Sequence, residues 1–263
     1  MHIQKMNYKM KHIKQSVFLA VLLSLSAIIS SYIAAEDPKE LVQQAIDLMN
    51  GRSSESEATM TITRPKWTRS ISMKNWSLGN DYNMILITAP AQDKGQSFLK
   101  RGKEMWNWIP SISRIVRIPP SMMGQSWMGS DFTNNDVVKR TTLVDDYTQS
   151  ILGSEFIDAY DTYKIQLIPK AKAAVIWGKV ILWVAKKEHF LLKAEYYDEK
   201  GKLINLETQT DIKHFGDRDL PSKFTIVPVN EKGKKTVLEF SKITFNVKLD
   251  ESFFSQQNMK NLR

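Results

Sequence analysis

The sequence predicts a mainly β protein with some helix, in which a curved antiparallel sheet, a half-barrel or incomplete β-barrel, wraps around helices. Three observations lead to this prediction. Polar and apolar residues alternate in many short segments, turn-forming residues separate these segments at regular spacing, and one amphipathic helix precedes the series. Because a sheet with so many strands in sequence curls, we expect a barrel-like curve.

Residues 1–35 have the pattern of a secretory signal peptide. The basic start contains no acid and holds Lys5, Lys9, Lys11 and Lys14. An apolar run over residues 17–29 follows, then Ala34 and Ala35 before the charged Glu36. The run is shorter than the roughly 20 residues of a spanning helix. We expect cleavage near Ala35 and a periplasmic domain of residues 36–263, with an uncleaved anchor as the alternative.

Composition argues against several classes of function. The chain has no cysteine, so the sequence offers no disulfide, no thiolate nucleophile and no lipidated N-terminal cysteine. Removing the four lysines of residues 1–35 from 37 basic residues leaves 33 against 28 acidic residues, a net charge of +5 without a polybasic tract. We therefore expect no nucleic-acid partner.

Catalytic motifs are also lacking. Only His189 and His214 remain after residue 35, and neither has the spacing of a metal ligand. Asp131 and Asp136 are interpreted as a turn residue and an acid at a helix N-terminus. The expectation is a protein that is not an enzyme and has no metal or cofactor.

One helix is predicted over residues 37–50. Asp37 is its N-cap, Pro38 occupies the first turn, and Glu40 is placed for a capping box. Leu41, Ala45 and Leu48 lie on one apolar face, which we expect to pack into the concave side of the sheet.

Twelve segments have the pattern of strands. They are residues 59–63, 70–73, 81–88, 96–101, 104–109, 113–118, 162–168, 179–185, 190–198, 203–213, 222–229 and 235–247. Short helices are expected after Thr133, which is a cap for a helix through Val138, and near residues 147–152.

Residues 118–132 are too rich in proline and glycine for a strand, yet strongly apolar. Loops are normally polar, and methionine repacks readily around varied apolar ligands. We predict a lid over an apolar cavity, formed by Met122, Met123, Trp127, Met128 and Phe132. Trp106, Trp108 and Trp183 are predicted to contribute to the interior behind it. The alternatives are a loop that only plugs the sheet and ordinary core tryptophans.

The segment QSFLKRGKEMWNWIPSISRIVRI at residues 96–118 resembles the outer-membrane lipoprotein-sorting protein family, the LolA-like group. So do MGSDFTNNDV at residues 128–137, LWV at 182–184, YYD at 196–198 and GK at 201–202. The resemblance implies an open curved sheet around helices, with an apolar cavity that binds acyl chains in the periplasm. It also implies a buried arginine that tethers the lid, for which Arg114 and Arg117 are candidates by chemistry.

The expected function is a periplasmic carrier that binds lipid or lipoprotein acyl chains for transfer toward the outer membrane. Its partners would be the acylated cargo and an envelope transporter or outer-membrane acceptor. The alternative is a non-enzymatic adaptor subunit of an envelope lipid-export transporter.

Overall fold

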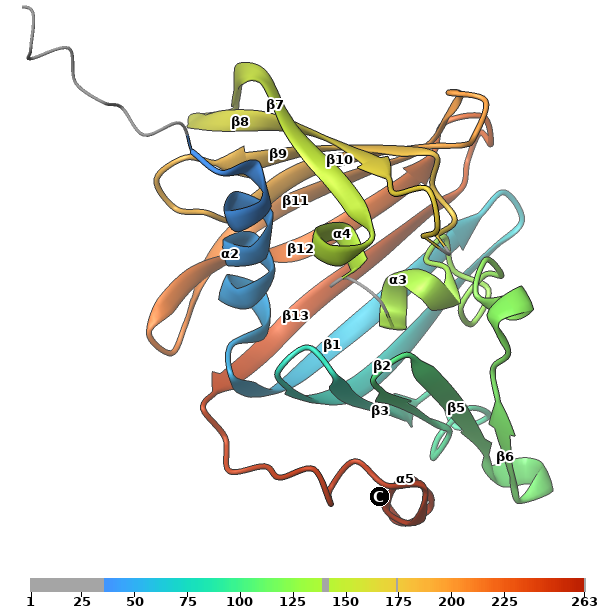
Figure 1. Cartoon of the computed structure of the whole chain (residues 1–263). Helices are drawn as coiled ribbons and strands as arrows, with labels where there is room; N and C mark the ends of the chain where they lie inside the picture. Colours follow the sequence, from blue (N-terminus) through green and yellow to red (C-terminus); the bar gives the residue numbers. More distant parts are fainter. Residues whose placement is uncertain (1–35, 139–141, 174, 263) are drawn as a thin grey trace, which may run out of the picture. The chain divides into compact units, whose positions relative to one another are not determined.

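Thirteen antiparallel strands form one sheet in the described part of the chain (Figure 1). The computed structural model describes residues 36–138, 142–173 and 175–262, so the predicted signal peptide lies outside the described residues. The strands are β1 (Ser53–Arg64), β2 (Trp67–Leu78), β3 (Tyr82–Ala89), β4 (Ser97–Arg101), β5 (Glu104–Ile109), β6 (Arg114–Arg117), β7 (Tyr147–Ile157), β8 (Tyr160–Pro169), β9 (Lys179–Ala185), β10 (Leu191–Tyr197), β11 (Leu203–Phe215), β12 (Arg218–Pro228) and β13 (Lys235–Phe245). All twelve predicted strands are present, and β7 is an additional one.

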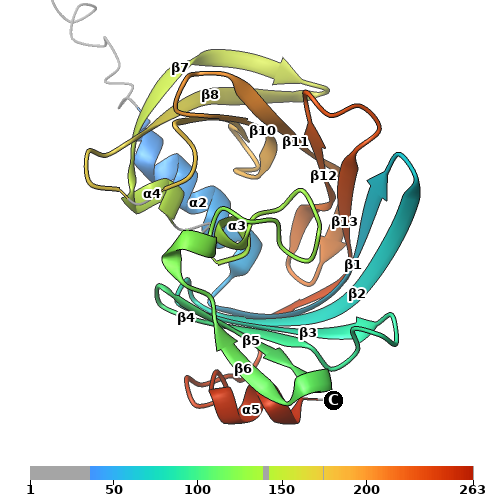
Figure 2. The ribbon, with the colours of Figure 1, turned by 90° about the vertical axis from the view of Figure 1, so that its right-hand side faces the viewer.

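The order of the strands determines where the predicted lid, residues 118–132, lies in the fold. The sheet runs β6-β5-β4-β3-β2-β1-β13-β12-β11-β10-β9-β8-β7, so β6 and β7, which are consecutive in the chain, are its two edges. The sheet is curved and, over the described residues, is not closed into a barrel (Figure 2). The segment that joins β6 to β7 must therefore cross from one edge to the other, and the predicted lid lies in this crossing segment.

Helix α2 (Pro38–Asn50) lies within the curve of the sheet (Figure 2). The Asp37 carboxylate accepts a hydrogen bond from the Lys39 backbone N–H at 2.9 Å, which confirms the predicted N-cap. Leu41 and Val42 are buried in a cluster with the inner side chains of β8 and β9. The predicted packing of this helix into the concave face is confirmed, and we call the face that it covers the inner face.

Three shorter helices complete the described chain, along with the 3₁₀ turns η1 (Pro110–Ile112) and η2 (Pro120–Met122). Helices α3 (Asn134–Val138) and α4 (Thr142–Asp145) lie within the curve, whereas α5 (Gln256–Asn261) lies outside it, beside β4 and β5 (Figure 2). In the described ranges, no helix is both long and apolar enough to cross a membrane.

The helix predicted near residues 147–152 is wrong. These residues begin strand β7, which pairs with β8 from Tyr147 opposite Pro169 to Ile157 opposite Tyr160. Tyr147 is buried and donates from its hydroxyl to the Trp177 carbonyl at 3.2 Å. Pairing with β8 thus overrides the local pattern, because strand formation depends on neighbours that are distant in sequence. The helix is α4, which ends just before the strand.

Candidate functional site

The inner face of β1–β4 changes from polar to apolar along the strands. Because neighbouring strands are in register, side chains that face inward lie in rows across the sheet. The first row consists of Ser54, Ser77, Asn83 and Lys100. The second row consists of Ser56, Asn75, Ile85 and Phe98. The third consists of Ala58, Met73 and Ile87, and the fourth of Met60 and Ile71. The change from hydroxyl, amide and ammonium groups to aliphatic side chains is complete by the third row.

A cavity of about 170 Å³ lies against these rows. Its lining includes the whole first row, residues of the second and third rows, and Met60. Trp127 and Phe132 contribute from the crossing segment, and Leu238 and Phe240 from β13. Gly79 and Asn80, in the turn between β2 and β3, line the polar end. The cavity is therefore amphipathic, polar toward that turn and apolar toward the crossing segment.

Residues 118–132 pack onto the inner face, although they contain almost no regular structure. Met123, Trp127 and Phe132 are buried in the same apolar cluster as Met60 and Phe98. The rings of Trp127 and Phe98 meet edge to face, with centroids 5.3 Å apart. Met128 packs partly buried against this cluster, whereas Met122 is 39% exposed. The predicted lid residues thus come together, with Met122 at the surface.

Trp106 and Trp108 lie on the opposite face of the sheet. Met105, which precedes Trp106 on β5, belongs to the inner cluster, so the alternation along the strand turns both tryptophans outward. There they pack in a cluster with Phe254 and Met259 of the C-terminal segment. They do not line the cavity, and their exposure is reduced by the C-terminal segment.

Trp183 also faces outward. It is 1% exposed, and its neighbours across the sheet are Lys164 on β8 and Lys193 on β10. Their ammonium nitrogens are 4.9 Å and 4.1 Å from the ring centroid, a cation–π arrangement. The indole N–H donates to Glu155 at 3.0 Å and holds the pKa of that carboxyl below its usual range. Trp183 is thus buried by lysines on the outer face, away from the cavity.

Helix α3 begins with a capping box. The Thr133 backbone N–H donates to Asp136 Oδ2 at 2.8 Å, and the Asp136 backbone N–H donates to Thr133 Oγ1 at 3.1 Å. Trp177 Nε1 lies 3.5 Å from Asp136 Oδ1. Burial raises the pKa of Asp136, against the opposing effect of the hydrogen bonds from Thr133 and Trp177. This cap stands at the end of the crossing segment, which contributes Trp127 and Phe132 to the cavity lining.

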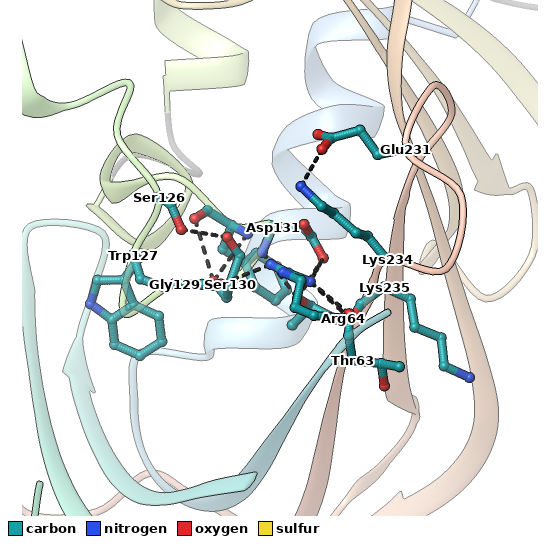
Figure 3. Close-up of polar contacts among 12 residues, drawn as sticks. Thr63, Arg64, Ser126, Trp127, Gly129, Ser130, Asp131, Glu231, Lys234 and Lys235 are labelled. Atoms are coloured by element: carbon teal, nitrogen blue, oxygen red, sulfur yellow. Dashed lines mark hydrogen bonds and ion pairs between the residues drawn. The ribbon is translucent and has the colours of Figure 1, made fainter. Parts of the chain in front are cut away.

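An arginine joins the crossing segment to the sheet at the apolar end of the cavity (Figure 3). Arg64, at the end of β1, places Nη1 3.0 Å from Asp131 Oδ2, and its Nη2 donates to the Gly129 carbonyl at 2.7 Å. Thr236 on β13 donates its hydroxyl to Asp131 at 2.7 Å and accepts from the Asp131 backbone N–H at 3.0 Å. The two charged side chains are 12% and 7% exposed. We call Arg64, Asp131 and Thr236 the latch.

The latch corrects two sequence interpretations. Asp131 is an ion-pair partner of the sheet rather than a turn residue alone. Arg117 pairs with Glu104 on the surface and its side chain is 62% exposed, while Arg114 is exposed as well. Among the described residues, neither of these arginines forms an ion pair with the crossing segment. Arg64 is the last residue of β1, and the alternation along the strand, which puts it on the same face as Met60 and Ile62, was the signal available in the sequence.

Comparisons with known proteins bear on the whole described chain. A family model described as an uncharacterized protein matches residues 79–261, most of the sequence. The chain belongs to this family. A comparison with curated protein sequences found no match.

Several solved structures share the fold of this chain. A DUF1329 family protein from Desulfovibrio piger is 26% identical with a TM-score of 0.77, over 85% of this chain and 100% of that one. An outer membrane lipoprotein-sorting protein domain from Vibrio parahaemolyticus is 23% identical with a TM-score of 0.76, over 85% and 98%. A LolA superfamily protein from Nitrosomonas europaea is 23% identical with a TM-score of 0.72, over 85% and 99%. The predicted curved-sheet fold is confirmed.

Proposed function

We propose that the protein is a periplasmic carrier that binds an acyl chain of a lipid or lipoprotein in its inner cavity and delivers it toward the outer membrane. The observation that carries this proposal is the cavity of about 170 Å³, which is apolar beneath the latched segment and polar at its other end. Each buried methylene contributes about 0.8 kcal/mol, so a long chain supplies ample free energy for binding.

The cavity is small for a complete lipid. Ligand pockets usually have volumes of about 300–1,000 Å³, against about 170 Å³ here. A larger cargo requires the crossing segment to move away from the inner face. The latch is the contact that such a movement must break, so opening is coupled to loss of the pairing between Arg64 and Asp131.

The alternative function is an adaptor subunit of an envelope lipid-export transporter. One observation favours it: the edge strand β7 exposes apolar side chains, with Leu152 51% and Phe156 69% exposed. An edge strand of this kind offers main-chain hydrogen bonds and apolar contacts to a partner strand. A carrier and an adaptor differ in whether the cavity holds cargo.

Native mass spectrometry of protein purified from the envelope tests the proposal. The wild type is expected to carry lipid in stoichiometric amount. Ala58→Leu places added volume in the cavity and is expected to abolish the bound lipid, because Ala58 lines it. Thr59→Leu, the next residue on β1 and on the outer face, is the matched control and is expected to retain lipid. Wild-type protein that carries no lipid and binds no acyl probe would contradict the carrier function and favour the adaptor function.

A further inference from the structure

The two ends of the sheet differ in charge. Hairpin turns join the described strands at both ends, because neighbouring strands run antiparallel. The six turns at the end where β1 passes into β2 hold eight lysines and four acids, a net charge of +4; they are residues 65–66, 90–96, 110–113, 170–178, 198–202 and 229–234. The five turns at the opposite end hold three lysines and four acids, a net charge of −1; they are residues 79–81, 102–103, 158–159, 186–190 and 216–217. We call the first end the basic end.

Three turns of the basic end lie side by side, those of β1–β2, β10–β11 and β12–β13 (Figures 1 and 2). Asn230 Nδ2 donates to the Leu203 carbonyl at 3.2 Å, which joins the β12–β13 turn to the start of β11. A Cβ on Gly233 would lie 3.5 Å from Pro65 Cγ, so the same turn also contacts the β1–β2 turn. One lysine of each turn is exposed and forms no ion pair with a described residue: Lys66, Lys200 and Lys232. Adjoining turns thus present three positive charges to the solvent.

Apolar side chains are exposed among these lysines. Trp67, which directly follows Lys66, is 49% exposed, and Val229 in the β12–β13 turn is 47% exposed. Tryptophan is enriched at membrane–water interfaces, where its ring is in contact with lipid and its N–H stays hydrated. Lysines together with an exposed tryptophan are typical of surfaces that bind anionic lipids. The basic end therefore combines an electrostatic attraction with an apolar anchor.

The latch lies at the same end of the sheet. Arg64 directly precedes the β1–β2 turn, and its guanidinium carbon is 5.9 Å from the centroid of the Trp67 ring, a cation–π contact. The same guanidinium forms the ion pair with Asp131. The exposed tryptophan and the crossing segment thus share one partner. A surface that contacts the basic end is next to the latched segment.

We propose that the basic end docks the protein onto an anionic lipid surface, with Lys66, Lys200 and Lys232 against the negatively charged head groups and the Trp67 ring at the interface. Charge complementarity selects this partner, because the turns of the basic end carry a net charge of +4 and those of the opposite end −1. The contact is peripheral and weakens as salt screens the charges. The inference goes beyond the proposed carrier function, and its test does not depend on what the cavity holds.

Vesicle flotation tests the docking. The exported protein is mixed with vesicles of phosphatidylcholine alone, or of equal parts of phosphatidylcholine and phosphatidylglycerol. The wild type is expected to float with the anionic vesicles and not with the neutral ones, and to be released as the salt concentration rises. Combining Lys66→Gln, Lys200→Gln and Lys232→Gln is expected to weaken binding about tenfold or more, because each lysine near an anionic surface adds to the attraction.

The matched control removes the same charge from the opposite end of the sheet. It combines Lys103→Gln, Lys187→Gln and Lys248→Gln, all at exposed positions, of which the last follows the end of β13 that pairs with Ser54. This variant is expected to bind anionic vesicles within about twofold of the wild type, because its lysines lie far from the docked surface.

A second measurement places Trp67. Anionic vesicles that contain brominated lipid are expected to quench the tryptophan emission of the wild type on binding. Trp67→Phe keeps an apolar ring at this position, so it is expected to bind similarly and to lose most of the quenching.

Several outcomes overturn the proposal. Equal binding to neutral and anionic vesicles, or binding to neither, refutes docking by charge, and this comparison needs no variant. Equal weakening by the two triple variants shows that only the net charge acts, which refutes the basic end as the docking surface. Quenching that persists in Trp67→Phe places another face of the protein at the membrane and refutes it as well.

Discussion

Arg64 Nη1 lies 3.0 Å from Asp131 Oδ2, which joins the end of the first strand to a segment 67 positions later in the chain. Both side chains are largely buried, and Thr236 completes the contact from a third element. Removing one partner of a buried ion pair leaves the other charge uncompensated. In the proposed carrier, release of the crossing segment from the inner face therefore requires loss of this ion pair.

Breaking the latch is the first prediction. Arg64→Met is expected to lower the free energy of unfolding by about 3–5 kcal/mol and to speed release of a bound acyl probe. Urea denaturation and stopped-flow displacement measure the two effects. A double-mutant cycle with Asp131→Asn is expected to give a coupling energy of about 0.5–3 kcal/mol.

Arg117→Met is the matched control, because the ion pair of Arg117 with Glu104 is exposed. It is expected to change the free energy of unfolding by less than about 1 kcal/mol. An Arg64→Met protein whose stability and release rate equal those of the control would contradict the role of the latch.

Two adjacent methionines give the second prediction. Met123 is 8% exposed within the inner cluster, and Met122 is 39% exposed. Met123→Ser is expected to cost about 2–5 kcal/mol in free energy of unfolding and to weaken probe binding, because it removes buried apolar volume. Met122→Ser is expected to change little. Replacing Met122, Met123 and Met128 together with serine should weaken binding of the acyl probe while the far-UV circular dichroism of the sheet stays the same. Unchanged binding of the probe would mean that the segment only plugs the sheet.

The C-terminal segment is expected to act on stability alone. Phe254 is fully buried against the outer face, in the cluster that contains Trp106 and Trp108. Phe254→Ala should cost about 3–5 kcal/mol in free energy of unfolding and red-shift the tryptophan emission. Affinity for an acyl probe, measured where the variant is folded, should equal that of the wild type. Lost affinity would show that the outer cluster contributes to binding.

Asp136 predicts a pH dependence of stability. Its pKa is raised above the ordinary 3.8 by burial, so the folded state binds a proton more tightly than the unfolded state. Its contribution to stability is present at pH below 3.8 and is lost as the pH rises through the raised value. The Asp136→Asn variant keeps an acceptor for Thr133 at this position but does not titrate there. The difference in unfolding free energy, wild type minus variant, should therefore fall as the pH rises; a flat difference would contradict the raised pKa.

Processing of the N-terminus is the last prediction. The exported protein is expected to begin at or near Glu36, since the small residues Ala34 and Ala35 precede it. N-terminal sequencing of protein from a periplasmic extract measures this. A product that keeps residues 17–29 and fractionates with membranes would support the uncleaved anchor.

The sequence by itself determined the local elements. Alternation of polar and apolar residues located twelve of the thirteen strands, and Asp37 with the apolar face of Leu41 located α2. The composition of residues 118–132 indicated a buried apolar segment, because proline and glycine exclude a strand there. These signals depend only on neighbours in the chain, so they can be recognised from the sequence without knowledge of the tertiary structure.

Only the tertiary structure decided which face each strand turns inward and which distant residues meet. Alternation shows that Trp106 and Trp108 share a face of the strand. It does not show whether this face is the inner or the outer one, because the same alternating pattern fits both orientations of the strand. The pairing of β1 with β2 and β13 brings Ser54 beside Ser77 and Arg64 near Thr236. The amphipathic cavity and the latch arise from strand register, which long-range pairing sets and local sequence does not contain.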